Sequence, residues 1–226
     1  MSETPQNQGP ENRRPLKTRG AGWAQALASA LGRAGASPNL ISATSIAFAF
    51  TGAGFLLASG VTEGALRVVC LIGAATCVQL RLLANMLDGM VAVEHGRGSP
   101  TGPIWNELPD RIADALFLVA AGYGASEAGP DVGLWLGWLA ALLAVLTAYI
   151  RELGRGLGFA ADFAGPMAKP HRMFALTVTC AVSAFEPLWG WFGESLAIGL
   201  AVIALGTAWT AVRRTRTLAR RLKEQA

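Results

Sequence analysis

Six apolar runs, each long enough to cross a lipid bilayer as a helix, follow one another along this chain of 226 residues. A helix needs about 20 mostly apolar residues to span the hydrocarbon core of a membrane. Hydrophobic residues make up 52% of the chain and charged residues only 15%, well below the roughly 25% that is usual in soluble domains. The sequence therefore predicts an all-α polytopic membrane protein with six transmembrane helices. The runs lie at residues 39–60, 64–87, 106–126, 132–152, 171–190 and 194–213.

Two segments precede the first apolar run. Residues 1–21 are polar and lack an apolar core, so we expect a disordered cytoplasmic tail and neither a signal peptide nor a folded element. From Trp23 to Gly35, apolar residues recur at helical spacing without strand-like alternation. This pattern predicts a short amphipathic helix lying at the membrane interface, which Pro38 ends. The transmembrane domain is expected to cover residues 22–226.

The distribution of charge predicts the orientation. Lys and Arg near the ends of spans stay in the cytoplasm. Basic residues lie before the first run, between the second and third, between the fourth and fifth, and after the sixth, whereas the opposite connections carry acidic residues and neither Lys nor Arg. We therefore expect an integral protein of the bacterial cytoplasmic (inner) membrane with both termini in the cytoplasm. The net charge of +4 then reflects topology and contact with anionic membrane lipids, and not binding of nucleic acid.

Metal-ligand side chains flank the connection between the second and third runs. Asn85 and Asp88 are three residues apart, so they share one face of a helix. Asn106, Asp110 and Asp114 follow at intervals of four and share a face in the same way. Such oxygen donors suit hard divalent cations, Mg²⁺ or Mn²⁺, and a pair of such ions is a recurring means of holding phosphate oxygens. Phosphoryl chemistry at the cytoplasmic end of the bundle is the leading hypothesis.

The same carboxylates have a purely structural interpretation. They can be solvated helix ends, or ion-pair partners of Arg81 and Arg111 that stabilise the bundle without a ligand. Ionisable groups inside a membrane are functional by default, and five polar residues on two facing helices favour a site. Of the two arginines in the second run, Arg67 is expected to snorkel outward. Arg81 lies near the cytoplasmic end, where a contact with a phosphate or carboxylate of the site stays open.

The spacing of this polar set resembles the signature of the CDP-alcohol phosphatidyltransferase family, DxxDGxxAR, eight residues, then GxxxDxxxD. Six spans after an interfacial helix and the Pro38-Asn39 entry to the first span are also similar to the family, so the resemblance covers almost all of the chain beyond the tail. Every spacing of the signature matches. The chain reads Asn85-x-x-Asp88-Gly89-x-x-Ala92-Val93, eight residues, then Gly102-x-x-x-Asn106-x-x-x-Asp110.

The resemblance implies a reaction. Members of the family transfer a phosphatidyl or related phospho-alcohol group from a CDP-linked lipid, such as CDP-diacylglycerol, to a small polar alcohol. CMP is released, two divalent ions assist, and the reaction belongs to phospholipid biosynthesis. A homodimer is implied as well. Carried over by position, Asn85, Asp88 and Asn106 are metal ligands and Asp110 is the base that activates the acceptor hydroxyl. Gly89, Ala92 and Gly102 stand at the positions that face the nucleotide.

Three departures from the signature change this assignment. Asn85 and Asn106 stand at the first and third Asp positions, and Val93 stands at the Arg position. An amide ligates through its carbonyl oxygen but brings no charge, so both replacements weaken the attraction for two divalent ions. Asp114 is an additional carboxylate that can restore one charge. We therefore expect Asp88, Asp110 and Asp114 to form the anionic set, with one of the last two as metal ligand and the other as base; Glu94 and Glu107 are nearby reserves.

A second basic stretch joins the fourth and fifth runs on the side of the expected site. Such a cluster holds phosphate or carboxylate groups, or it only sets the topology. The resemblance favours binding of the anionic parts of the acceptor or nucleotide. The expected ligand-binding residues are Arg151 and Arg155 first, then Arg172 and Lys169.

Two other functions stay open at this point. The chain can be a catalytically inactive relative that binds a CDP-lipid, or a membrane cation transporter that uses the same residues. Transporters often place their sites near mid-membrane and show broken helices or inverted repeats. Here the acidic residues cluster towards one edge and no repeat is visible. The sequence does not identify the acceptor alcohol.

Overall fold

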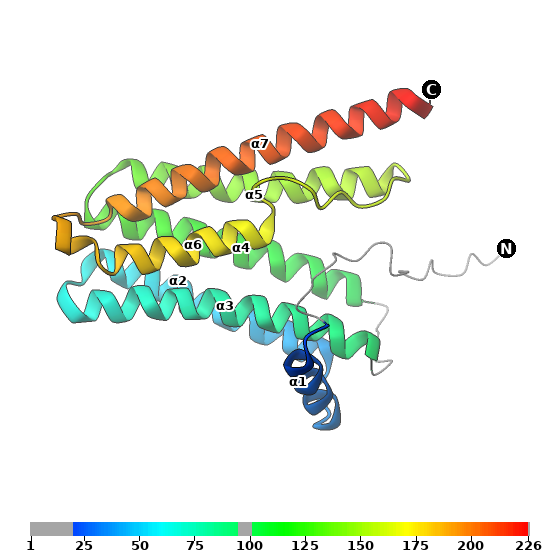
Figure 1. The fold of residues 1–226 in the computed structure, drawn as a ribbon, viewed down its shortest axis with the longest axis horizontal. Coiled ribbons are helices and arrows are strands. Elements are labelled where there is room, and N and C mark those ends of the chain that lie inside the picture. Colours follow the sequence, from blue (N-terminus) through cyan, green and yellow to red (C-terminus); the bar gives the residue numbers. More distant parts are fainter. Residues whose placement is uncertain (1–19, 95–100, 226) are drawn as a thin grey trace.

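Every regular element is helical in the computed structural model, which describes residues 20–94 and 101–225 (Figure 1). The all-α prediction is confirmed for this part of the chain. The expected tail lies almost wholly outside the described residues. The elements are α1 (Gly22–Arg33), α2 (Pro38–Val61), α3 (Gly64–Glu94), α4 (Gly102–Ala128), α5 (Val132–Gly156), α6 (Lys169–Ser183), the 3₁₀ helix η3 (Glu186–Trp189) and α7 (Glu194–Gln225).

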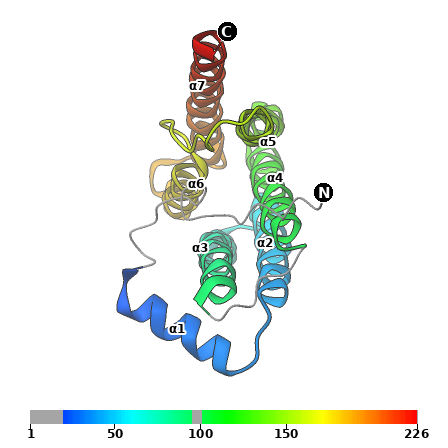
Figure 2. The same ribbon diagram turned by 90° about the vertical axis from the view of Figure 1, so that its right-hand side faces the viewer.

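The helices α2 to α7 run side by side as a bundle, and α1 crosses one end of it. Viewed along the bundle, α2, α4 and α5 form one row and α3, α6 and α7 lie beside them (Figure 2). The main pairs in contact are α2 with α3 and α4, α3 with α4 and α6, α4 with α5 and α7, α5 with α7, and α6 with α7. The shared core is apolar and draws on every one of these helices. Its fully buried members include Leu56, Leu71, Phe117, Leu176 and Leu200.

Glycines let α4 approach its neighbours closely. A Cβ atom at Gly122 would lie 2.8 Å from the Cα of Gly137 on α5, and one at Gly60 on α2 would lie 2.8 Å from the carbonyl oxygen of Gly124. Side chains of any size at these positions would force the helices apart. Small residues at contacts of this kind are the usual means of packing membrane helices. They hold α4, which carries three of the five residues of the predicted metal site, against both α2 and α5.

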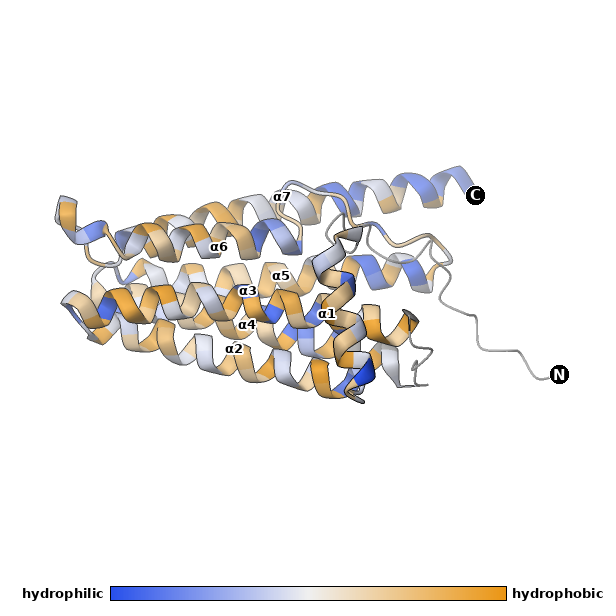
Figure 3. Ribbon diagram, turned by 60° about the horizontal axis from the view of Figure 1, so that its bottom comes forward, coloured by the Kyte–Doolittle hydropathy of each residue, from blue (hydrophilic) through white to orange (hydrophobic). Residues whose placement is uncertain are grey.

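Four helices of the described residues are long and apolar enough to cross a membrane, namely α2, α3 up to Val93, α5 and α7. The predicted spans 106–126 and 171–190 also correspond to helices. However, α4 carries several charged residues between Glu107 and Asp114, and α6 has only 15 residues. The count of six spans therefore stays a prediction. Hydrophilic residues gather at the C-terminal ends of α5 and α7 and at the start of α6, while the rest of the bundle is mostly hydrophobic (Figure 3).

The predicted span 171–190 is wrong at its C-terminal end. Helix α6 stops at Ser183, and Glu186–Trp189 form a separate 3₁₀ turn. Pro187 has no backbone N–H to donate and its ring obstructs the preceding turn, so an α-helix does not continue through it. Gly190 then takes a φ of 77°, a left-handed conformation that suits glycine. The chain turns back here into α7.

The first helix is present where the sequence predicts it. Its Ala24 and Ala28 are fully buried and cluster with apolar side chains of α3 such as Leu87 and Val91. On the predicted apolar face, Trp23 stays 56% exposed. An exposed Trp suits the membrane interface, where one side of the ring is apolar and the other wet. The interfacial position of α1 stays a prediction.

The prediction that Arg67 snorkels outward to the membrane surface is wrong. Arg67 is only 2% exposed and forms a buried ion pair with Glu186. It also donates a hydrogen bond of 2.8 Å to the carbonyl oxygen of Ser59. Glu186 in turn accepts hydrogen bonds from the backbone N–H groups of Gly193 and Ser195. Arg67 reaches Glu186 inside the protein because the connection of α6 to α7 lies at the same end of the bundle as the start of α3 (Figure 1).

Candidate functional site

Three helices bring the predicted polar residues together at the opposite end of the bundle from Arg67. The C-terminal third of α3 supplies Asn85 and Asp88, the first half of α4 supplies Asp110 and Asp114, and α6 begins beside them. The three carboxylates are buried, with Asp88, Asp110 and Asp114 exposed by 4%, 6% and 1%. They are therefore not solvated helix ends. Their burial requires partners, because an isolated charge in an apolar setting is strongly destabilising.

Asp110 is surrounded by cations. Its Oδ1 lies 3.0 Å from a guanidinium nitrogen of Arg81, which also donates to the Asp110 carbonyl oxygen. Its Oδ2 accepts a hydrogen bond from the Lys169 ammonium at the start of α6, and Arg111 lies 3.6 Å away. The aspartate predicted as the base is thus held between α3 and α6.

Asp114 lies one helical turn deeper and faces two arginines. Its Oδ1 is 3.0 Å from Arg81, and its Oδ2 is 3.1 Å from Arg172. Arg172 is 1% exposed and also donates to the Met167 carbonyl oxygen at 3.1 Å. The additional carboxylate of this chain therefore ties α4 to α3 and α6.

Asp88 differs from the other two carboxylates because none of the cations that the structure describes forms an ion pair with it. Its Oδ2 accepts a hydrogen bond of 2.6 Å from the Ser42 hydroxyl of α2. Its Oδ1 is buried and has no hydrogen-bond partner among the described residues. Asp110 and Lys169 are close enough to act on it electrostatically. The Asp88 carboxylate thus keeps one buried oxygen that no described side chain satisfies.

The structure describes the side chain of Asn85 but not that of Asn106, the two amides that stand at Asp positions of the signature. The Asn85 side-chain oxygen accepts a hydrogen bond of 3.0 Å from the Lys169 ammonium. Asn106 lies in the first turns of α4, but its side chain lies outside what the structure describes, as do Glu94's side chain and the residues 95–100. The expected role of Asn106 stays a prediction. The positions expected to face the nucleotide lie on the same two helices: Gly89 and Ala92 near the end of α3, and Gly102 at the first residue of α4.

The basic residues at the end of α5 and the start of α6 divide into two groups. Lys169 and Arg172 contact the buried carboxylates Asp110 and Asp114. Arg151 pairs instead with Glu107 and Glu152, and its guanidinium lies 5.4 Å from the ring centroid of Phe163. Arg155 contacts Glu152 at 2.8 Å and is the more exposed of the two arginines. Glu107, expected as a reserve ligand, thus links Arg151 and Arg111.

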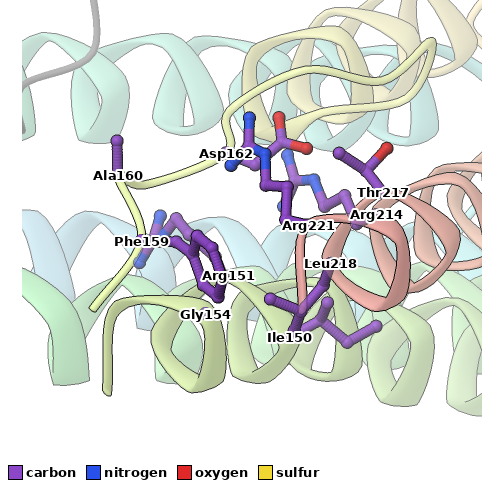
Figure 4. A pocket seen from close by; sticks show the side chains of 10 residues that line it. All are labelled: Ile150, Arg151, Gly154, Phe159, Ala160, Asp162, Arg214, Thr217, Leu218 and Arg221. Carbon is purple, nitrogen blue, oxygen red and sulfur yellow. The ribbon is translucent and has the colours of Figure 1, made fainter. Parts of the chain in front are cut away.

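A narrow basic pocket lies beside this second group. Figure 4 shows Arg151, Arg214 and Arg221 lining it together with Asp162. Its volume is about 20 Å³, room for about one water molecule. Arg214 donates to the carbonyl oxygens of Ala164 and Thr147 at 2.9 and 2.8 Å and so fastens the α5–α6 connection to the bundle.

The donor set suits a divalent cation at one place. Asp88 offers a buried, orphaned carboxylate oxygen, the ligand type that Mg²⁺ and Mn²⁺ prefer. Among residues 20–94 and 101–225, no three side chains of His, Cys, Asp or Glu are grouped so that they could hold a metal ion. Asp110 and Asp114 are already matched by cations of the chain itself. Asp88 is therefore the described carboxylate of this set that has an oxygen with neither a hydrogen bond nor an ion pair.

Solved structures of a membrane-lipid enzyme share this architecture. Phosphatidylinositol phosphate synthase from Mycobacterium tuberculosis with CDP-DAG bound matches with a TM-score of 0.73 and 24% identity, over 88% of this chain and 94% of that chain. The same synthase with manganese and citrate matches with a TM-score of 0.72 and 23% identity, over 86% and 88% of the two chains. This chain has the fold of that synthase. No protein-family model and no curated protein matches the chain.

Two contributors to the site were missed or left open by the sequence. Ser42 is one hydroxyl among several small residues of α2, and nothing in its spacing marks it as the partner of Asp88. The position of Arg81 within an apolar run did indicate a buried partner, because a charge in such a run requires one. The structure makes it the shared partner of Asp110 and Asp114. The structural interpretation of these two carboxylates is thereby correct in part, since the cations that face them are Arg81, Arg111, Lys169 and Arg172.

Proposed function

We propose that this chain transfers a phosphatidyl or related phospho-alcohol group from a CDP-linked lipid to a small polar alcohol, with release of CMP. One observation carries the proposal: the residues of the variant signature, Asp88 and Asp110, converge with Lys169 at one end of the bundle. They do so in a fold shared with a synthase whose structure holds CDP-DAG. The reaction belongs to phospholipid biosynthesis.

The location of the site supports this chemistry. The outer faces of the bundle expose many large apolar side chains, including Leu66, Trp135 and Leu205, which suit contact with lipid tails. The polar end of the bundle suits a nucleotide and a water-soluble acceptor. We place this end, and both termini, in the cytoplasm because the basic residues gather there. A homodimer stays a prediction from the family resemblance.

Asp88 is the described carboxylate that would hold a divalent cation. Gly89 follows it directly on α3, and with Ala92 and Gly102 it is our assignment for the surface that the nucleotide approaches. When bound, the ion supplies positive charge to the pyrophosphate oxygens and stabilises the leaving CMP. Mg²⁺ and Mn²⁺ both suit the oxygen donor. Asn106 is the further ligand that we assign from its position in the signature.

Asp110 is our assignment for the base. In the reaction, the acceptor oxygen forms a bond to the phosphorus on the lipid side, the bond from that phosphorus to the bridging oxygen breaks, and CMP leaves. The acceptor proton passes to the Asp110 carboxylate. Asp110 is the less deeply buried carboxylate of α4, and its ammonium partner Lys169 is 14% exposed, so a small acceptor can reach it. Asp114 is enclosed by Arg81 and Arg172 and positions them.

Arg151 and the basic pocket beside it are our assignment for the anionic part of the acceptor. Arg151 lies next to Glu107, and Glu107 lies one turn from Asp110 on α4. A phosphate or carboxylate that displaced Glu107 from Arg151 would lie close to the base. Arg155 is turned towards Glu152 and contributes general positive charge. The pocket is too small for such a group as it stands, so Arg151 itself is the expected contact.

The purified protein in detergent with CDP-diacylglycerol, Mn²⁺ and a panel of alcohols tests the proposal. We expect CMP release that depends on one of the alcohols. Nucleotide binding without CMP release for any alcohol would identify an inactive relative. Metal uptake into proteoliposomes without CMP release would identify a cation transporter. Either result would contradict the proposed function.

A further inference from the structure

We infer that the Lys169 ammonium is a built-in cation that takes the place of one of the two expected metal ions, so that the site binds a single divalent cation at Asp88. The inference deepens the proposed function and rests on it for the use of that cation in catalysis. The number of bound ions is a separate property that is measured without substrate.

The position of Lys169 carries the inference. Its ammonium contacts the side-chain oxygens of Asn85 on α3 and Asp110 on α4. Both residues belong to the signature: Asn85 is an expected metal ligand, and Asp110 is expected to be either the base or a metal ligand. A divalent cation between these helices would use the same two oxygens. Because Lys169 comes from a third helix, α6, the packing of the bundle fixes its charge there.

The buried charges around Lys169 also balance one another. Three buried carboxylates, Asp88, Asp110 and Asp114, face three buried or mostly buried cations. These cations are Arg81, Lys169 and Arg172. Arg111 also approaches Asp110, and it shares Glu107 with Arg151. The three buried carboxylates and the three cations of this set therefore balance one another.

The donor adds two negative charges, one on each phosphate of its pyrophosphate. One divalent cation restores neutrality, whereas two would leave an excess of two positive charges. Uncompensated charge is costly in a buried site of low dielectric. This balance favours a single ion, and it places that ion at Asp88, where one carboxylate oxygen has no hydrogen-bond partner.

The amide at position 85 agrees with this arrangement. A neutral oxygen accepts a hydrogen bond from an ammonium without adding a charge that would attract a second ion. A carboxylate at the same position would bring the protein groups to a net negative charge. Asn85 and Lys169 thus act together, and changing both is the decisive test.

Mn²⁺ binding to the full-length protein in detergent measures the number of ions. We expect titration calorimetry to give one Mn²⁺ per chain, and electron paramagnetic resonance to give the spectrum of an isolated ion. Asp88→Asn should abolish this binding. Two ions per chain with an exchange-coupled spectrum would overturn the inference, and so would the absence of Mn²⁺ binding.

The double variant Asn85→Asp with Lys169→Met should bind a second Mn²⁺, coupled to the first. Lys169→Arg keeps the positive charge and should still bind one ion. Lys223→Met, at the exposed end of α7, is the matched control and should also bind one. A folded double variant that still binds one ion would overturn the inference; if it does not fold, the wild-type spectrum decides. Failure to release CMP would contradict the proposed function and leave the Mn²⁺ count unaffected.

Discussion

Arg81 of α3 and Asp114 of α4 form an ion pair of 3.0 Å in which the arginine side chain is fully buried and the aspartate side chain is 2% exposed. The same guanidinium reaches Asp110 at 3.0 Å. One arginine therefore bridges two carboxylates on successive turns of α4. The integrity of the site depends on a residue that does not touch the reacting atoms in our account.

Replacement of Arg81 by Ala should lower the free energy of unfolding by about 3–5 kcal/mol, because it leaves buried carboxylates without compensation. Denaturant unfolding in detergent measures this change. Arg220→Ala is the control, since its pair with Glu224 is exposed and exposed pairs contribute little. Equal stability of the two variants would contradict the role of Arg81.

Asp110→Asn removes the carboxylate that we propose as the proton acceptor. It should lower kcat by roughly 10²–10⁴-fold, the usual contribution of a general base. The Michaelis constant for the CDP-lipid should change little. Initial rates of CMP release give both quantities. Wild-type kcat in Asp110→Asn would remove Asp110 from the chemistry.

Asp114→Asn should act mainly on stability, since it leaves Arg81 and Arg172 short of a buried partner. We expect a loss of about 3–5 kcal/mol in the free energy of unfolding and a smaller loss of kcat than in Asp110→Asn. Calorimetric unfolding and CMP release on the same preparation separate the two effects. A variant as stable as wild type but without turnover would instead make Asp114 the base.

Arg151→Ala should raise the Michaelis constant for the acceptor about tenfold or more, the loss of one charge-assisted contact, and change that for the CDP-lipid less. Arg155→Ala is the matched control on the same helix and should have the smaller effect, because its guanidinium contacts Glu152 away from the carboxylates. The comparison requires steady-state kinetics with each substrate varied in turn. An acceptor constant that changes more in Arg155→Ala would reverse the assignment.

Arg67→Ala should lower stability and leave both Michaelis constants unchanged, because the Arg67–Glu186 pair lies at the far end of the bundle from the site. Thermal unfolding and CMP release measured on the folded fraction check this. Glu186→Gln tests the same pair from the other side. A changed Michaelis constant in both variants would show that the two ends of the bundle are coupled.

The helices were predictable from the sequence because their signals are local. Apolar runs and the turn residues between them place α2, α5 and α7 within a few residues of their observed bounds, apart from the polar extension of α7 to Gln225. The error at the end of α6 is also local in origin, since Pro187 and Gly190 were visible within the predicted run. The hydrophobic content of the run outweighed them in the prediction.

The pairing of charges was not predictable in the same way. Lys169 and Asn85 are separated by 84 residues, and their contact depends on how α6 packs against α3. Helix periodicity gives the face on which a residue lies but not the height at which a distant helix begins. The sequence therefore indicated the carboxylates and the basic stretch as separate features, while their mutual neutralisation required the fold.

The coupled formation of CMP and a new phospholipid tests the account most directly. The purified protein is incubated with CDP-diacylglycerol labelled in its acyl chain, Mn²⁺ and the alcohol that supports CMP release, and both products are quantified, with Asp110→Asn in parallel. We predict equal amounts of CMP and labelled product lipid from the wild type, and at least about a hundredfold less of both from the variant. CMP without a product lipid, or equal turnover by the variant, would contradict the account.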